Sequence, residues 1–196
     1  MWFAVALCII LFEGIKQIFS SSEHRSVYRI VSERVSSDKV PIHCRPTLLA
    51  YVVLGGLRTH DYNLALDVLT EHRDELPWTT MSNRMLRQVF EVGVIFGRKM
   101  ITQDAFAELG SRSSLKRNEI EAMDNLQLWI NGRLNESTVD LSNTYFAVYP
   151  AYDEWFKGQV LSNTGRLQQA KEHFRKCLIL AGPEAAELRE EVRRRL

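Results

Sequence analysis

The sequence has few of the residues from which metal centres and disulfide frameworks are built. Its 196 residues include only three cysteines, Cys8, Cys44 and Cys177, and none of them stands at a metal-binding spacing from another. Two of the three lie within apolar patterns, where cysteine behaves as a small hydrophobe. We therefore expect no metal site, and a reducing compartment is the simpler interpretation.

An excess of charge of either sign is also missing. Lys and Arg total 25 against 24 Asp and Glu, which gives a formal net charge of +1. A general nucleic-acid binder normally carries a strongly basic face, so we expect no nucleic-acid partner. The chain has only five prolines and no low-complexity run, so nothing indicates a disordered linker. The 45% hydrophobic content is ordinary for a folded domain.

The local motifs that most often mark an enzyme are absent. The chain has no G-x-x-x-x-G-K-S/T phosphate loop, no H-E-x-x-H, no paired C-x-x-C and no G-x-S-x-G elbow. His43 and Cys44 are adjacent, but no third polar partner stands near them in sequence, which is weak evidence for catalysis. We expect a protein that is not an enzyme, with no cofactor and no small-molecule substrate. The alternative is an enzyme on a helical scaffold to which His43 and Cys44 contribute.

The N-terminus carries the longest apolar stretch. Residues 2–12 are unbroken apolar, and extending the stretch to residue 19 includes Glu13 and Lys16. A bilayer span needs about 20 residues, so residues 1–19 are predicted to be either a membrane anchor or a first buried helix. Basic residues that follow the stretch would place the C-terminal domain in the cytoplasm; the alternative is a soluble cytoplasmic protein. Residues 20–45 are expected to form an amphipathic helix and a proline-bounded connector.

The best-patterned stretch is residues 152–183. It is typical of two short amphipathic helices joined by a turn at residues 163–165, with apolar residues of the second helix at three-and-four spacing. Gly158 and Ala170 are small enough for two antiparallel helices to approach closely, and Phe174 fills the space beside them.

This stretch resembles a tetratricopeptide repeat (TPR), in which Gly158, Ala170 and Phe174 would occupy the family's glycine, alanine and phenylalanine positions. Gly93 and Ala105 have the same separation, and Ala65 with Pro77 matches the family's proline spacing. The resemblance covers roughly residues 46–183. It implies an all-α fold in which antiparallel helix pairs stack into a short right-handed solenoid, with Ala105 and Ala170 buried.

One stretch departs from the pattern. Between residues 115 and 150 we expect a helix that ends at about Leu134 and a shorter second helix over residues 140–149. After Pro183, acidic residues early and Arg193, Arg194 and Arg195 late indicate a solvated capping helix. Residues 46–196 are therefore predicted to be one TPR-like domain closed by this helix.

A helical repeat of this kind holds partners, so the resemblance implies a scaffold or adaptor that binds a protein or peptide. The family's groove positions imply a surface that suits an acidic and apolar segment. The alternative function is a structural or assembly subunit of a membrane protein complex, and the alternative meaning of the aromatic groove residues is core packing. The implied groove residues are Arg87, Phe90, Val94, Arg98, Tyr152, Trp155, Gln159 and Asn163.

Overall fold

The computed structural model describes residues 28, 31–33, 40–112 and 115–196, and across those ranges the regular structure is helical, without a strand. The all-α prediction is confirmed for that part of the chain. The predicted N-terminal helix (1–19) lies outside it, and so does the amphipathic segment (20–45) except for residues 28, 31–33 and 40–45. No helix among the described residues is long and apolar enough to cross a membrane.

The chain divides into two compact units, Met1–Met85 and Leu86–Leu196. In the first unit, α3 and α4 form a helix pair with Leu49, Val52 and Val53 buried on α3 and Ala65 and Leu69 on α4. The elements here are η1 (Ile42–Cys44), α3 (Arg45–Arg58), α4 (Tyr62–Glu71), η2 (Arg73–Glu75) and η3 (Trp78–Thr80).

Gly55 and Gly56 lie inside α3, which continues past them to Arg58. A Cβ on Gly55 would collide with the ring of Tyr28. A Cβ on Gly56 would come within 2.9 Å of the carbonyl oxygen of Asp61 and 3.1 Å of the Cβ of Ala65. The glycines therefore serve close packing within the helix, where they cost backbone entropy but leave room for neighbours.

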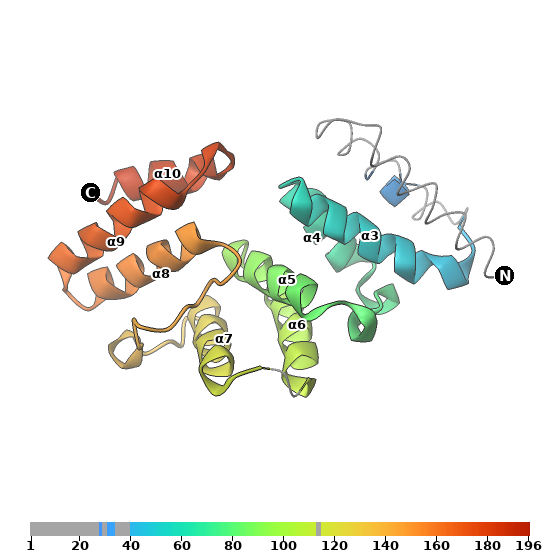
Figure 1. The fold of residues 1–196 in the computed structure, drawn as a ribbon, viewed down its shortest axis with the longest axis horizontal. Coiled ribbons are helices and arrows are strands. Elements are labelled where there is room, and N and C mark those ends of the chain that lie inside the picture. The colour runs from blue at the N-terminus through green and yellow to red at the C-terminus, as the bar shows by residue number, and fades with distance from the viewer. Residues whose placement is uncertain (1–27, 29–30, 34–39, 113–114) are drawn as a thin grey trace. The chain divides into compact units, whose positions relative to one another are not determined.

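The second unit is dominated by the α8–α9 pair (Figure 1). Gly158 lies where the ring of Phe174 approaches α8 most closely; an added Cβ would lie 2.5 Å from that ring. Ala105 and Ala170 are buried, as predicted. The elements are α5 (Asn83–Ile95, which begins in the first unit), α6 (Lys99–Ser111), α7 (Arg117–Ile130), η4 (Glu136–Thr138), α8 (Pro150–Asn163), α9 (Leu167–Leu180), η5 (Pro183–Ala185) and α10 (Ala186–Arg193).

Four helices end in the same hydrogen-bonded turn. In each, an amide donates back five residues to a helical carbonyl: Asp61 to Gly56 (2.9 Å), Arg98 to Gly93 (2.7 Å), Arg133 to Leu128 (2.8 Å) and Arg166 to Leu161 (2.9 Å). The residue before each donor has a positive φ, at His60, Gly97, Gly132 and Gly165. This is the Schellman arrangement, in which a left-handed residue lets the chain reverse. The four turns recur about every 35 residues, close to the TPR period.

The turns also give a residue-by-residue correspondence between helix pairs. Counting from the turn donors, Ala65, Thr102 and Ala170 are equivalent, and each of their amides donates to the carbonyl of its own turn donor. Gly93 corresponds to Gly56 and Leu161, and not to Gly158. The sequence-based match of Gly93 with Gly158 is therefore displaced by three residues, because the α5–α6 turn comes earlier in its repeat than spacing alone indicates.

The third turn is not followed by a helix. α7 ends at Ile130, short of the expected Leu134, because Gly132 has a φ of +66° and reverses the chain. The predicted helix over residues 140–149 is wrong. Asn135 accepts hydrogen bonds from the amide and hydroxyl of Ser137, and Asp140 accepts the same pair from Ser142. Such local side-chain bonds compete with helix formation, so residues 134–149 are irregular apart from the single turn η4.

Candidate functional site

The groove residues implied on α5 are mostly interior. Phe90 and Val94 are buried, and the Phe90 ring lies 6.1 Å from that of Phe106 on α6. Arg87 is also buried, and its guanidinium lies 5.9 Å from the Phe90 ring. Of the four implied residues in this repeat, only Arg98 is exposed. With the three-residue displacement of the repeat, the positions equivalent to Tyr152, Trp155 and Gln159 are Arg84, Arg87 and Glu91, of which only Arg84 is exposed.

On α8 the implied residues lie in a crowded environment. Tyr152 and Trp155 are half-buried with ring centroids 6.3 Å apart, and Trp129 of α7 lies 5.3 Å from Trp155. Gln159 is buried, with 8% of its surface exposed. Asn163 is exposed and donates to Glu136 of η4 at 3.2 Å. The core-packing alternative therefore accounts for much of this face of α8.

Two buried donors on this face have no acceptor. Trp155 Nε1 and Gln159 Nε2 are enclosed, and neither finds a hydrogen-bond partner among the described residues. The residues are four apart on α8 and so lie on adjacent turns of one face. Unsatisfied buried donors are uncommon in folded proteins. These two N–H groups are therefore available to donate to an acceptor that the described residues do not supply.

Glu91, which sequence reasoning did not single out, organises the irregular segment before α8. Its carboxylate accepts from Arg87 Nε at 2.7 Å and from the amides of Ala147, Val148 and Tyr149 at 2.9, 3.0 and 3.2 Å. Burial raises the pKa of this carboxyl above its ordinary value, while the Arg87 charge and the backbone donors act in the opposite direction. Four donors directed at one carboxylate still favour a structural role for the ionised group.

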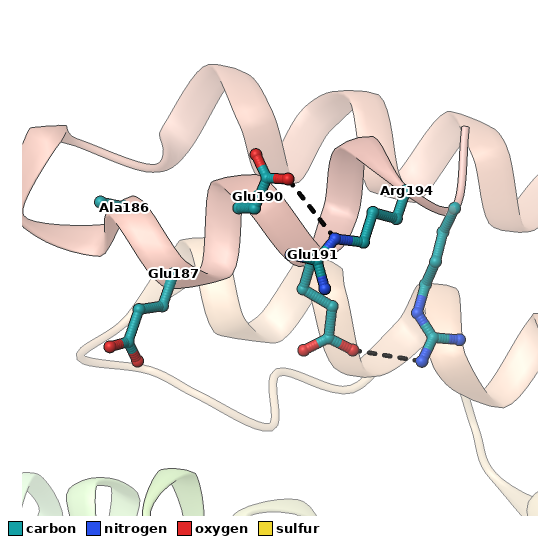
Figure 2. A pocket seen from close by; sticks show the side chains of 6 residues that line it. Ala186, Glu187, Glu190, Glu191 and Arg194 are labelled. Atoms are coloured by element: carbon teal, nitrogen blue, oxygen red, sulfur yellow. Dashed lines mark hydrogen bonds and ion pairs between the residues drawn. The ribbon is translucent and has the colours of Figure 1, made fainter.

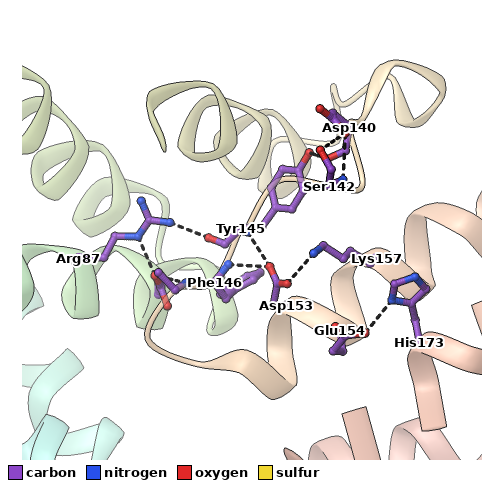
Figure 3. A network of polar contacts seen from close by, with 11 residues as sticks. Arg87, Asp140, Ser142, Tyr145, Phe146, Asp153, Glu154, Lys157 and His173 are labelled. Carbon is purple, nitrogen blue, oxygen red and sulfur yellow. Dashed lines mark hydrogen bonds and ion pairs between the residues drawn. The ribbon is translucent and has the colours of Figure 1, made fainter. Parts of the chain in front are cut away.

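Asp153 continues the same arrangement (Figure 3). Its Oδ1 accepts from the amides of Tyr145 at 2.6 Å and Phe146 at 3.0 Å, and its Oδ2 lies 2.9 Å from Lys157 Nζ. Five consecutive amides, from residue 145 to residue 149, thus donate to two carboxylates. Arg87 adds a bond to the carbonyl of Tyr145 at 2.8 Å. The two carboxylates and Arg87 thus pair backbone groups that a helix would have paired internally. This pairing explains how an irregular segment is tolerated where its backbone is partly buried.

The segment follows α8 from one end to the other in antiparallel sense. Glu136 meets Asn163 near the C-terminus of α8, and Tyr145 and Phe146 meet Asp153 near its N-terminus. Between these points Asp140 lies close enough to Lys157 for the lysine charge to help lower its pKa, although the two donors of Ser142 are the larger cause. The segment therefore stands beside α8 where a regular repeat would have a second helix.

An open hollow is present in the first unit, and sequence reasoning missed it. Its α3 wall consists of Thr47, Ala50, Tyr51 and Leu54, which recur at helical spacing, and Met81 and Met85 lie opposite. In the turn-based correspondence Thr47, Ala50 and Leu54 are equivalent to Tyr152, Trp155 and Gln159. The small Thr and Ala side chains replace a tyrosine and a tryptophan, so this repeat has space where the α8 repeat is filled.

A second hollow runs beside α10 (Figure 2). It is lined by Ala186, Glu187 and two ion pairs, Glu190 with Arg194 at 3.4 Å and Glu191 with Arg195 at 3.1 Å. Exposed ion pairs between residues four apart on a helix contribute little to stability, and the two charges of each pair neutralise one another. The sequence predicts a helix after Pro183, and α10 lies there; we assign no site to it.

The residues considered for catalysis do not converge. Both lie in η1, where His43 is exposed and Cys44 is half-exposed. Within the described ranges no group of three or more His, Cys, Asp or Glu side chains could hold a metal ion. Cys177 is buried in α9, and burial raises the pKa of its thiol to about 12.

No protein-family model matches the sequence, and no curated protein or solved structure matches it either.

Proposed function

We propose that this protein is a TPR-like helical-repeat adaptor that holds a segment of another protein. The observation that supports the proposal is the Schellman turn repeated four times at nearly the TPR interval, with equivalent residues in each helix pair. Repeating helix pairs of this kind stack into right-handed solenoids whose first helices line a shared binding surface. In this proposal α3, α5, α7 and α8 are those first helices.

The irregular segment after α7 fits the proposal as a variation of one repeat. It occupies the place of a second helix beside α8 and satisfies its own backbone through Glu91 and Asp153. The array can then continue into α8 without a gap in its core. The protein is proposed to act without a cofactor and without chemistry of its own.

Membrane attachment through residues 2–19 is part of the proposal. An apolar stretch of this length with two charged residues could insert at one leaflet or span a thin bilayer. The basic residues that follow it favour a cytoplasmic position for the repeats.

A structural subunit of a membrane complex is the second candidate, and one observation favours it. Ile179 and Leu180 at the end of α9 are 82% and 52% exposed, and Leu167 at its start is 59% exposed. Ile179 and Leu180 are adjacent, and together they form a small apolar surface that a neighbouring subunit would cover.

Cross-linking in the native cell followed by purification in mild detergent tests the proposal. An adaptor gives a cross-linked partner that dissociates when the cross-linker is omitted. A subunit gives the same set of proteins in fixed stoichiometry without any cross-linker. If the chain is recovered alone under both conditions, the proposed function is wrong.

A further inference from the structure

The most open part of the proposed binding surface lies on α3. At the three positions where α8 has Tyr152, Trp155 and Gln159, α3 has Thr47, Ala50 and Leu54. At the same positions α5 has Arg84, Arg87 and Glu91, of which Arg87 and Glu91 are buried in an ion pair with each other. Within the described residues, the second and third of these positions are occupied by buried side chains on α5 and by large, partly or fully buried side chains on α8, while the three α3 positions border a hollow.

The chemistry of the hollow suits an apolar side chain. Ala50 and Leu54 contribute apolar surface on α3, Met81 contributes it from the segment that leads into α5, and Met85 contributes it from the first turn of α5. Both methionines are almost fully buried, at 4% and 7% exposure, so they form a floor. Methionine adapts its shape to what it contacts, and Thr47 supplies a hydroxyl at the rim.

Two cationic side chains lie next in position to residues that line the hollow. Arg58 lies on the same side of α3 as Tyr51 and Leu54, two turns beyond the first and one turn beyond the second. Arg84 immediately precedes Met85. Both are exposed, and neither has an acidic partner within the described part of the chain. The other nearby arginine, Arg45, is already paired with Glu75 at 3.0 Å. The surroundings of the hollow are therefore complementary to negative charge.

From these observations we infer that the α3 hollow binds an acidic segment of a partner protein that inserts one large apolar side chain, such as leucine, between α3 and the two methionines. Carboxylates on either side of the anchor pair with Arg58 and Arg84. This inference rests on the proposed adaptor function and gives it a location and a partner class. A partner without the apolar anchor, or with basic flanks, does not fit the site.

The test uses the full chain in mild detergent and a fluorescent synthetic peptide in which one leucine is flanked by glutamates. Fluorescence anisotropy is expected to show saturable binding that weakens as salt is added, because exposed charges are screened. Two control peptides, one with serine for leucine and one with lysine for every glutamate, are expected to bind at least about tenfold more weakly, a loss typical of removing a buried anchor.

Matched variants locate the site. Ala50→Phe fills the hollow, and Ala107→Phe makes the same change at an exposed position of α6. Arg58→Glu reverses a charge beside the hollow, and Arg175→Glu does so on the exposed face of α9. Ala50→Phe and Arg58→Glu are each expected to weaken the peptide about tenfold, and the two controls are expected to leave it unchanged. Circular dichroism checks that each variant is folded, and if Ala50→Phe is not, the Arg58→Glu comparison decides.

Three results overturn the inference: no saturable binding of the glutamate–leucine peptide, equal binding of the lysine peptide, or equal loss in the hollow variants and their controls. Each leaves the adaptor proposal standing if native cross-linking still captures a partner. If native cross-linking captures no partner but the peptide still binds at the hollow, the adaptor proposal is the one that is contradicted.

Discussion

Glu91 carries more of the second unit's local order than any other side chain described. It is fully buried and holds Arg87 on its own helix and three successive amides ahead of α8. Removing one partner of a buried ion pair is costly because the other charge remains without compensation. The three amides would lose their acceptor in the same step.

Glu91→Ala is therefore expected to lower the free energy of unfolding by about 3–5 kcal/mol. Urea denaturation followed by circular dichroism measures the change. Glu187→Ala, at an exposed carboxylate of α10, is the control and should have almost no effect. Equal stability of the two variants would show that Glu91 does not hold the segment.

Cys177 gives a second prediction at this scale. Burial raises its pKa from the ordinary value of 9.0 to about 12. The thiol of the folded protein therefore stays protonated at pH values at which an exposed thiol would ionise. Its contribution to stability is full below pH 9.0 and declines as the pH rises from there toward 12. In a Cys8→Ser, Cys44→Ser background, a thiol reagent at pH 8 should label Cys177 only when urea unfolds the chain. Rapid labelling without urea would contradict the burial of Cys177.

At the scale of the helix, close approach depends on small residues placed at the contact. Ala170 is 2% exposed in α9, and Gly158 on α8 leaves room for the ring of Phe174. Larger side chains at such contacts force off-rotamer conformations or move the backbone.

Ala170→Leu is expected to destabilise the protein by about 1–3 kcal/mol through overpacking. Ala186→Leu makes the same substitution at an exposed position of α10 and should be nearly neutral. Thermal unfolding compares the two, and the assignment of the α8–α9 contact fails if their melting temperatures are the same.

The helix pairs were predictable from sequence because their signal is local. Apolar spacing and small contact residues identified α8 and α9, and the burial of Ala105 and Ala170 followed. The register of α5 was not predictable by matching glycine to alanine, since Gly93 could be aligned with Gly158 just as well as with Gly56. Only the hydrogen bond from Arg98 to Gly93 distinguishes them.

The irregular segment shows a different limit. Asn135 and Asp140 could be read as local helix breakers, but the amides of residues 147 to 149 depend on Glu91, which is more than fifty residues away. No local pattern reports such a partner. The α3 hollow was missed for a related reason, because it results from small side chains at positions whose equivalents become visible only when the turns are aligned.

For the whole molecule, membrane attachment through residues 2–19 can be tested by removing them. If they anchor the protein, removing them should release the remainder as a soluble and helical protein, since the described helix pairs bury their own apolar faces. Sedimentation after extraction without detergent and circular dichroism measure this. Aggregation of the truncated chain, with the full chain soluble without detergent, would identify residues 2–19 as part of the core.

The proposed binding of another protein through α3 can be tested by photo-cross-linking in the native cell. A photoreactive phenylalanine analogue replaces Thr47 at the rim of the hollow and, in separate control proteins, Asn63 on α4 or Lys176 on α9, all three exposed. We expect one defined adduct from position 47 and none of the same mass from positions 63 and 176. The same adduct from all three positions, or none from position 47, would contradict it.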